Sequence, residues 1–328
     1  TKHLDGVLDC FCGFRSWAAL VDSDDDLKAA NTPGCVDRER SVNLRSRIKP
    51  WMPPALLEVR QRRLGHVLRF TDGLADWTEA LRQSSGYSVD SIIERVAAAT
   101  RAVVAGRARY ERDSVLFHES DYRYPIVTQL LRAALVNRGR LNVIDFGGSF
   151  GSTYRQCRPL LDGVDEVRWQ VIEQPAFVSI GQREFTTEEL SFVPTIQELT
   201  PSEVPALILL SSVLQYLEHP EPTLTQLLRL DATHLVVDRT PFSTQPDDRL
   251  CVQHTPSSIY DASYPCWILS APRLRGLVLS EGWQIEAEFD SGDGHFRTAR
   301  GLEFVFRGFI AERPPANAFR RPPGSRDP

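Results

Sequence analysis

The sequence lacks the features that mark membrane, secreted and nucleic-acid-binding proteins. No stretch approaches the roughly 20 apolar residues that span a bilayer. The beginning, TKHLDGVLDCFCGF, has no basic region followed by a long apolar core. Lysine and arginine together number 38 against 43 acidic residues, for a net charge of −5. Because this balance offers a polyanion no attraction, we expect neither a nucleic-acid partner nor membrane insertion.

The six cysteines follow no metal-binding or disulfide pattern. None belongs to a C-x-x-C pair or has a histidine at zinc spacing, and Cys10 and Cys12 are too close for an easy mutual disulfide. The sequence therefore predicts no metal site and favours a reducing, cytoplasmic location.

The character of the chain changes along its 328 residues. Residues 1–48 have no sustained helical or strand period, which predicts a poorly ordered N-terminal arm. Residues 49–140 are mostly helical in pattern and predict a cap or lid segment, and residues 141–312 alternate short apolar runs with helical patterns. The tail over residues 313–328 is rich in proline and arginine and is expected to be disordered.

Two helices are predicted in the segment before residue 141. The first is capped by Ser88 or Asp90 and ends near Gly106; the second begins near Pro125 and stops at Gly139. The apolar residues at helical spacing are Ile92, Val96, Ala99 and Val103 in the first, and Ile126, Leu130, Ala134 and Leu135 in the second.

Residues 141–312 predict an α/β fold, a Rossmann-like, doubly wound sheet of seven mostly parallel strands. The apolar runs LNVIDF, VRWQVIE, PALILLSSVL and HLVVDR are separated by helical patterns, as in a parallel sheet with both faces covered. Between the last runs, WQIEAEF and GLEFVFRGFI, the stretch SGDGHFRTAR is too short and polar for a helix. These two strands are therefore expected to pair antiparallel at the sheet edge, which gives the sheet an antiparallel edge strand.

The stretch NVIDFGGSFGS, residues 142–152, indicates a ligand site at the end of the first of these strands. Gly147, Gly148 and Gly151 follow the acid Asp145, and glycines permit positive φ and a close approach of the backbone to a ligand. Ser149 stands where a dinucleotide fingerprint needs its second glycine, and no lysine provides the end of a nucleoside-triphosphate loop. Both phosphate-binding interpretations are therefore weak.

The same turn resembles the acid-x-Gly-x-Gly-x-Gly turn of class I S-adenosylmethionine-dependent methyltransferases. Asp145, Gly147 and Gly151 match it, with Gly148 inside the turn and Ser149 in place of the middle glycine. The resemblance implies S-adenosyl-L-methionine as cofactor. It also implies contacts from later segments: Glu173 to the ribose with Gln174 beside it, Gln197 or Glu198 to the adenine, and Ser211, Ser212 and Gln215 to the methionine portion.

At a finer level the chain resembles a family of bacterial proteins classed as methyltransferases and often encoded among surface-polysaccharide genes. The segments that carry this resemblance are KPWMPPALL, ADWTEAL, GYSVDSIIERV, YERDSVLF, VIDFGGSFGSTY, VIEQPAFVSIG, LLSSVLQYLE, VVDRTPF and IYDASYP. Together they span roughly residues 48–310, and their order makes them fairly specific as a set. The resemblance implies a role in polysaccharide biosynthesis and leaves the substrate open.

The second substrate is expected near the segment VVDRTPF and the long loop after it. Asp238 and Arg239 follow an apolar run, and an arginine there suits a carboxylate or phosphate, such as the diphosphate of a nucleotide-sugar; a local ion pair between the two is the alternative. The loop carries His254, the predicted catalytic base, with His219 as its rival. Asp238, Arg239 and His254 are the predicted catalytic group.

The segment YERDSVLFHESDYRYP is the predicted lid over the cofactor cleft. It contributes Tyr110, Arg112, Asp113 and Phe117. Packing at a domain junction is the favoured interpretation for its aromatic residues, and Asp113 is left open.

The sequence therefore predicts an S-adenosylmethionine-dependent methyltransferase that acts on a small-molecule or carbohydrate-linked acceptor. Two alternatives remain. One is an NAD-dependent oxidoreductase or epimerase on a related sheet. The other is a methyltransferase fold that has lost turnover and serves as a scaffold, which Ser149 and the absence of an obvious base make possible.

Overall fold

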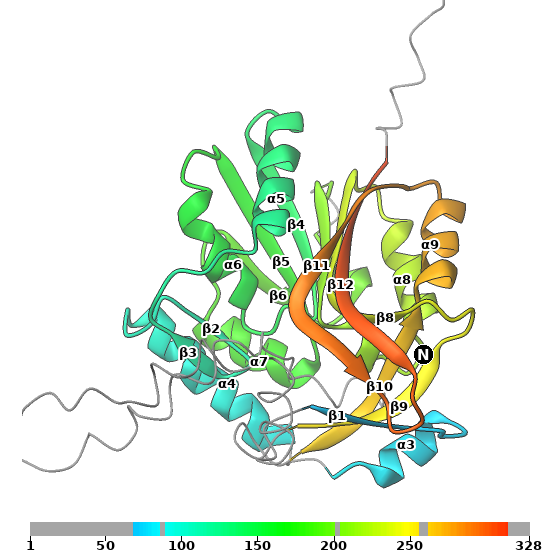
Figure 1. Ribbon diagram of the computed structural model, residues 1–328. Helices are drawn as coiled ribbons and strands as arrows, with labels where there is room; N and C mark the ends of the chain where they lie inside the picture. The colour runs from blue at the N-terminus through cyan, green and yellow to red at the C-terminus, as the bar shows by residue number, and fades with distance from the viewer. Residues whose placement is uncertain (1–67, 86–88, 201–203, 256–261, 314–328) are drawn as a thin grey trace, which may run out of the picture.

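The computed structural model describes residues 68–85, 89–200, 204–255 and 262–313 (Figure 1). The predicted arm over residues 1–48 and all of the predicted tail except Arg313 lie outside the described residues. In the described part of the chain, no helix is both long and apolar enough to cross a bilayer.

A mostly parallel sheet forms the centre of the molecule, as the apolar runs predict. Its main strands lie in the order β6-β5-β4-β7-β8-β12-β11. The five parallel strands are β4 (Arg140–Phe146), β5 (Glu166–Ile172), β6 (Leu190–Val193), β7 (Leu207–Ser211) and β8 (His234–Ser243). Because strand order reverses at β4, ligands are expected at the carboxyl ends of β4 and its neighbours.

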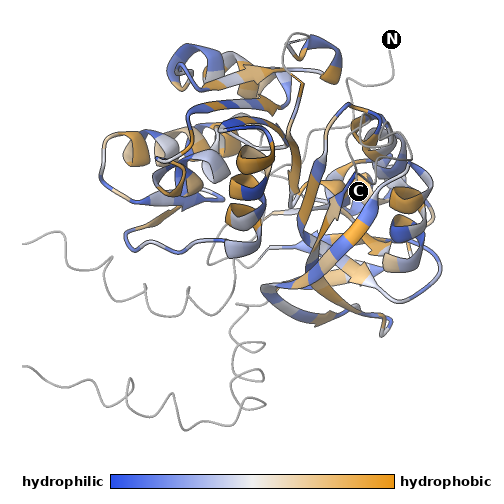
Figure 2. Ribbon diagram, turned by 90° about the horizontal axis from the view of Figure 1, so that it is seen from above, coloured by the Kyte–Doolittle hydropathy of each residue, from blue (hydrophilic) through white to orange (hydrophobic). Residues whose placement is uncertain are grey.

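Helices cover both faces of this sheet (Figure 1). They are α4 (Val89–Val104), α5 (Tyr124–Val136), α6 (Ser152–Cys157) and α7 (Pro175–Glu184), which pack with one core cluster, and α8 (Pro220–Leu228) and α9 (Ala271–Ser280), which pack with the other. Successive strand residues alternate between the clusters: Leu207 and Leu209 belong to the first, Ile208 and Leu210 to the second. Figure 2 accordingly shows mostly hydrophobic inner strands. Because these strands are buried on both faces, polar and apolar residues do not alternate along them.

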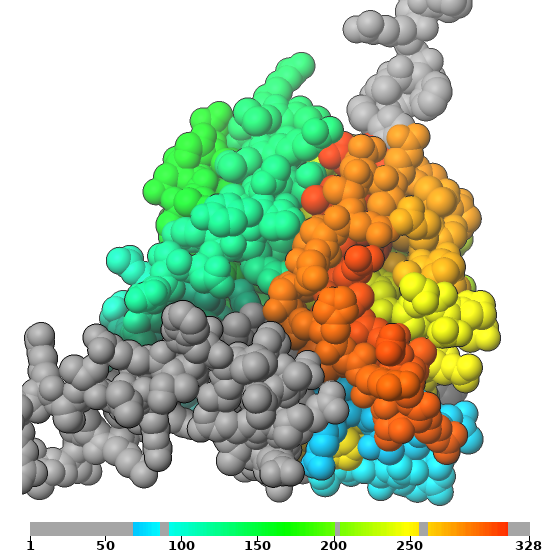
Figure 3. All heavy atoms as spheres, viewed as in Figure 1, coloured from blue at the N-terminus to red at the C-terminus, as the bar shows by residue number. Residues whose placement is uncertain are grey.

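The last two strands pair antiparallel as predicted, but the antiparallel strand is not at the edge. β12 (Glu303–Glu312) runs antiparallel to β8 on one side and to β11 (Gln284–Arg297) on the other, so β11 forms the edge. The β11–β12 hairpin reaches the surface beside α5 (Figure 3), where Arg132 forms an ion pair with Glu312 at 2.7 Å. The apolar pattern of the two strands was sufficient to predict that they pair with each other. It could not specify which of the two also pairs with β8.

The stretch predicted as a long loop after Asp238 is largely strand. β8 continues to Ser243 and is followed by β9 (Arg249–His254) and β10 (Ser263–Ser270), which pair antiparallel. Residues 256–261 of that stretch lie outside the described residues. The polar residues in DDRLCVQH interrupt the apolar pattern that a buried strand normally has. The sequence therefore predicts a loop where the structure has strand β9.

The region before residue 141 contains strands as well as the predicted helices. β1 (Arg69–Asp72) pairs with β9 and so extends the sheet, and α3 (Trp77–Gln83) lies beside it, with Trp77 stacked on Trp267 at 6.1 Å between ring centroids. β2 (Tyr110–Arg112) and β3 (Val115–Phe117) form a separate hairpin. The division of the chain into cap and catalytic domain remains a prediction.

The two predicted helices are present as α4 and α5. In α5, Ile126, Leu130 and Ala134 are buried as expected, whereas Leu135 is 80% exposed. Ala134 and Leu135 are adjacent and lie about 100° apart around a helix of 3.6 residues per turn, so Leu135 falls outside the face that packs on the sheet.

Candidate functional site

A cavity open to solvent lies at the carboxyl ends of β4, β5 and β7 and at the bulged part of β8, where open parallel sheets bind their ligands. Its lining includes Glu111, Arg112, Asp113, Asp145, Gly147, Gly148, Ser149, Ser152, Thr153, Gln156, Glu173, Ser211, Ser212 and Arg239. Seven of the residues predicted from the sequence to bind cofactor or substrate are thus brought together: Asp145, Gly147, Gly148, Glu173, Ser211, Ser212 and Arg239.

The glycine turn after β4 is shaped by close contacts within the protein. Gly147 has a φ of +75°, and a Cβ there would lie 2.5 Å from Val213 Cγ2. A Cβ on Gly148 would collide with the Asp145 carboxyl group. Ser149 has a φ of 54°, the left-handed region that favours glycine. The serine that replaces the expected glycine therefore adopts the backbone conformation a glycine would supply.

Glu173 is a buried carboxylate that holds this turn in place. It directly follows β5, is only 3% exposed, and accepts hydrogen bonds from the backbone N–H of Ser149 (3.1 Å) and of Gln174 (3.0 Å). Burial raises the pKa of Glu173 to about 7. A carboxylate offers about four acceptor positions, so two remain for a ligand in the cavity.

Asp145 is a second buried acid at the base of the turn. Its Oδ2 accepts a hydrogen bond of 3.0 Å from Trp169 Nε1, and burial raises its pKa to about 7. Trp169 itself is fully buried under the turn. The indole fixes the carboxyl group against the backbone of Gly148, so Asp145 shapes the turn as well as lining the cavity.

The β2–β3 hairpin forms the wall opposite the glycine turn. Glu111 accepts a short hydrogen bond from Ser152 Oγ, and Arg112 Nη2 donates to Gln156 Oε1 at 3.3 Å, so the hairpin is bonded to α6. Tyr110 is buried and stacks on Phe117 with 4.3 Å between ring centroids. The packing interpretation of these two aromatic residues is supported, and the charged residues of the same segment face the cavity.

Asp238 and Arg239 lie inside β8 rather than at its end, at a bulge opposite Gly308. The register passes from Val237–Phe309 to Thr240–Arg307, so two β8 residues oppose one β12 residue. Arg239 has a φ of 52° and lines the cavity. Bulges redirect side chains, and here the bulge turns the guanidinium toward the site.

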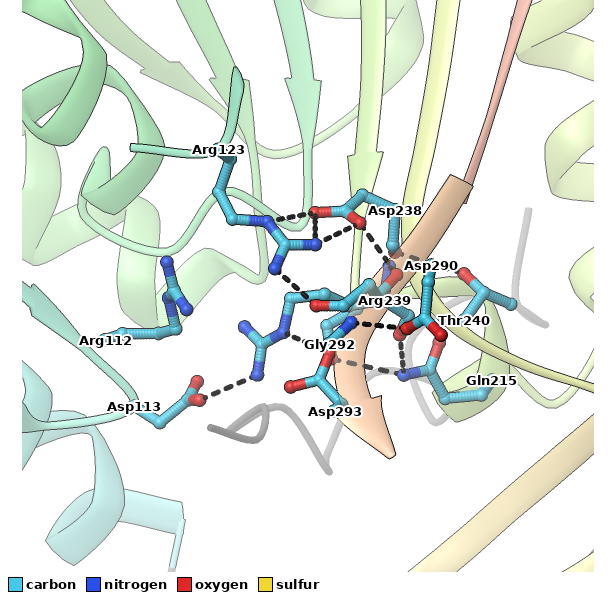
Figure 4. A network of polar contacts seen from close by, with 12 residues as sticks. Arg112, Asp113, Arg123, Gln215, Asp238, Arg239, Thr240, Asp290, Gly292 and Asp293 are labelled. Carbon is cyan, nitrogen blue, oxygen red and sulfur yellow. Dashed lines mark hydrogen bonds and ion pairs between the residues drawn. The ribbon is translucent and has the colours of Figure 1, made fainter. Parts of the chain in front are cut away.

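The partners of Asp238 and Arg239 differ. Asp238 is fully buried and accepts two bonds from Arg123 Nη2, at 2.6 and 2.8 Å, and one from Ser291 Oγ at 2.9 Å. Arg239 donates from Nη2 to Asp113 Oδ2 at 3.2 Å (Figure 4). The predicted local pair between Asp238 and Arg239 is thus replaced by two pairs with residues far away in the sequence. Asp238 has a structural role in this arrangement.

Unusual backbone conformations concentrate at the cavity. Among the described residues, six non-glycine residues have positive φ, and four of them, Asp113, Ser149, Ser212 and Arg239, line it. Such conformations cost on the order of 1–3 kcal/mol each and persist where surrounding structure enforces them, often at functional sites. Their clustering is a second reason, independent of the sequence, to regard this cavity as the candidate functional site.

Three predicted site residues support the cavity without lining it. Gly151 begins α6 with a φ of 82°, and a Cβ there would lie 2.8 Å from Leu190 Cδ2. Gln174 is buried at the start of α7. Gln215 lies beneath the site, where its Nε2 donates to Ser212 Oγ at 3.1 Å and to Arg239 O at 3.2 Å.

Three others lie apart from the cavity lining. His254 ends β9, where its Nε2 is 3.0 Å from Thr71 Oγ1. His219 has a side chain that is 70% exposed, and Gln197 lies exposed in a short 3-10 helix. This geometry gives no support to either histidine as the base, and the assignments of His254 and Gln197 stay predictions. In the described part of the chain, no three metal-ligating side chains gather in one place.

Residues that the sequence did not single out complete the site. Glu111 and Gln156 line the cavity, and Arg123, Ser291 and Asp293 surround Asp238 and Arg239. Ser291 and Asp293 belong to SGDGHFRTAR, in which the two glycines that flank Asp293 were the only available sign of a special backbone.

We expect Gly147→Val to destabilise the protein by about 3 kcal/mol or more, because it combines a disfavoured positive φ with overpacking against Val213. Urea denaturation of the unliganded protein would measure this. Gly163→Val is the control, since a Cβ at Gly163 meets nothing within 4 Å. Equal stability of the two variants would contradict the contact with Val213.

No protein-family model matches the chain, and no curated protein matches its sequence. Among solved structures, it is similar to a 1,6-didemethyltoxoflavin-N1-methyltransferase of Burkholderia thailandensis (15% identity, 74% of this chain and 92% of that one, TM-score 0.35). It is also similar to the magnesium protoporphyrin IX methyltransferase of Synechocystis PCC 6803 (12%, 84% and 100%, 0.36) and to the cyclase SpnF (13%, 74% and 98%, 0.38). With scores this low, the fold assignment rests on the strand order rather than on these likenesses.

Proposed function

We propose that the protein is an S-adenosylmethionine-dependent methyltransferase acting on a small-molecule or carbohydrate-linked acceptor. The observation that carries this proposal is the buried Glu173 beside the glycine turn, at the carboxyl ends of adjacent strands and with acceptor positions free. A carboxylate in this position suits the two hydroxyl groups of a ribose, because each oxygen can accept one of them.

The charges of the cavity favour this cofactor over a dinucleotide or a nucleoside triphosphate. Four carboxyl groups line it, from Glu111, Asp113, Asp145 and Glu173, against two guanidinium groups, from Arg112 and Arg239. Burial raises the pKa of three of these acids, Glu111, Asp145 and Glu173, to about 7, so their repulsion of a pyrophosphate grows as the pH rises through 7. S-adenosylmethionine carries a sulfonium and an ammonium group, and the carboxyl groups of the cavity attract both of these positive charges.

Arg112 provides the complement for the cofactor's single carboxylate. Its guanidinium is buried and donates a hydrogen bond to the neutral amide of Gln156. Burial, and next the neighbouring Arg239, lower the pKa of Arg112. Since arginine stays protonated in proteins, an anion at this position would relieve the repulsion between the two guanidinium groups.

When bound, the cofactor supplies an electrophilic methyl group. The residues of this chain then have to align the acceptor with it, exclude water and remove a proton. Ser149, the main departure from the glycine pattern, already has the required left-handed backbone. This removes one reason for regarding the protein as a scaffold without enzymatic turnover.

Isothermal titration with adenosylhomocysteine and with NAD tests the proposal. Adenosylhomocysteine should bind and NAD should not. Methylthioadenosine, which lacks the amino-acid portion, should bind Arg112→Gln as well as it binds the parent, whereas adenosylhomocysteine should lose about tenfold in affinity, the scale of one charged hydrogen bond. Arg155→Gln is the matched control, because Arg155 is partly buried on α6 and outside the cavity lining.

Binding of NAD in preference to adenosylhomocysteine would instead favour an oxidoreductase or epimerase. Loss of methylthioadenosine affinity in Arg112→Gln would place Arg112 at another part of the ligand. The proposed link to surface polysaccharides is tested separately, by comparing cell-surface glycans of a deletion strain with those of its parent for a missing methyl group.

A further inference from the structure

Arg239, Asp113 and Asp293 form a charged cluster next to the proposed cofactor site. β11 bulges outward between Asp290 and His295, and this bulge brings Asp293 Oδ2 to 3.6 Å from Arg239 Nε. Ser291, in the same bulge, accepts a bond of 3.0 Å from the backbone N–H of Arg239 and so fixes the bulge against β8. Figure 4 shows Asp113, Arg239 and Asp293 facing one another.

Three buried polar atoms of this cluster lack hydrogen-bond partners among the described residues. They are Arg239 Nε and both carboxylate oxygens of Asp293. Asp293 is 4% exposed, and buried polar groups without partners are rare enough in proteins to call for an explanation. The separation of 3.6 Å between Nε and Oδ2 is too long for a direct hydrogen bond.

One donor beside two acceptors is the pattern that a hydroxyl group satisfies. Its oxygen can accept a bond from Arg239 Nε–H, and its proton can be donated to Asp293. A carboxylate ligand would be repelled by Asp293 and Asp113. An ammonium group has only donors and could not accept the bond from Arg239 Nε–H. The cluster therefore selects a neutral hydroxyl group over either charged group.

We propose that Asp293 is the general base for an acceptor hydroxyl group held between its carboxylate and Arg239. This rests on the proposed methyltransferase function and narrows the acceptor to an alcohol or a sugar hydroxyl. Asp293 takes the hydroxyl proton as the oxygen lone pair forms its bond to the methyl carbon. The electron pair of the broken methyl–sulfur bond stays on sulfur, the product is an ether, and the proton on Asp293 passes to solvent.

The environment of Asp293 fits this role. Burial raises the pKa of Asp293, while the nearby Arg239 and Arg123 oppose the increase. A carboxylate with a raised pKa is a stronger base at neutral pH. Arg239, which forms the ion pair with Asp293, also lines the cavity of the proposed cofactor site, so Asp293 lies directly behind a residue of that cavity wall.

The test uses the full chain, tritiated-methyl S-adenosylmethionine and a small-molecule extract of the cells that make the protein. Asp293→Asn should lower tritium transfer at least about a hundredfold, the usual loss for a general base. Adenosylhomocysteine affinity should not fall, because Asp293 is not among the residues that line the cofactor cavity. The free energy of unfolding is measured beside it, because the variant also loses the ion pair with Arg239. The control is Asp290→Asn, which alters an exposed neighbour bonded to Gly292 N.

The chemistry of the product supplies a second readout. An ether keeps its tritium in mild alkali, whereas a methyl ester releases labelled methanol. Retained transfer in Asp293→Asn, an alkali-labile product, or a parent that binds adenosylhomocysteine without transferring methyl would each overturn the proposal. If Asp293→Asn does not fold, Asp293→Ser removes the carboxylate with less volume and should show the same loss. A parent that fails to bind adenosylhomocysteine would overturn the proposed function instead.

Discussion

Glu173→Gln should lower adenosylhomocysteine affinity by about a hundredfold, the equivalent of roughly 2.7 kcal/mol. Hydrogen bonds to a charged group contribute about 1.5–3 kcal/mol each, and the amide replaces one of the two carboxylate oxygens with a donor. Isothermal titration measures the change. Glu166→Gln is the control, because Glu166 lies exposed at the opposite end of the same strand. Unchanged affinity in Glu173→Gln would contradict ribose recognition by this residue.

The same variant should alter the pH dependence. Burial raises the pKa of Glu173 from 4.5 to about 7, so the parent should bind adenosylhomocysteine more tightly as the pH rises through about 7 and the carboxylate ionises. Glu173→Gln should lose this component. Without ligand the sign is opposite, because a raised acid pKa stabilises the fold below 4.5 and this stabilisation is lost as the pH rises through about 7. Titration and thermal unfolding between pH 5 and 8 would check both signs.

Glu173 comes directly after β5, where an acid contributes little to a core, and on that ground alone Glu173→Ala would leave the fold intact. The carboxylate instead accepts the backbone N–H groups of Ser149 and Gln174. Alanine would leave both donors unsatisfied, so glutamine is the better substitution for separating binding from stability.

The sequence was sufficient to predict the sheet and the glycine turn because both depend on local patterns. Strands buried on two faces appear as continuous apolar runs, as in LNVIDF, and the turn requires small residues at fixed positions after Asp145. The resemblance to the methyltransferase pattern drew attention to Glu173 at the end of VRWQVIE, and in the structure its carboxylate accepts the backbone N–H of Ser149 in the turn.

The rest of the site depends on contacts between distant segments. Arg123, which precedes α5, reaches Asp238 across 115 positions of sequence, and the bulge that carries Asp293 arises from a register shift between β11 and β12. Nothing in SGDGHFRTAR distinguishes such a bulge from an ordinary polar connection. His254 was predicted to lie in a loop. In the structure it is the last residue of strand β9.

We expect Arg123→Met to lower the free energy of unfolding more than Arg112→Gln, Arg155→Gln or Arg132→Met. The Asp238 side chain is 0% exposed and that of Arg123 15%, so the bonds from Nη2, at 2.6 and 2.8 Å, are shielded from water. Removing one partner of a buried ion pair costs about 3–5 kcal/mol, because the other charge is left buried without compensation. Ser291 Oγ would remain as a donor to Asp238 and is too weak a partner for a full charge.

Urea denaturation of three variants isolates the origin of this loss. Arg123→Met combined with Asp238→Asn should recover a large part of it, because the uncompensated charge is then absent. Arg132→Met is the matched control: it lies on α5 and pairs with Glu312, but its side chain is 57% exposed, and exposed pairs contribute little. If Arg123→Met were no more destabilising than Arg132→Met, the Asp238 carboxylate would not depend on Arg123 for its compensation. The bulge of β8 and the position of Arg239 would then need another support.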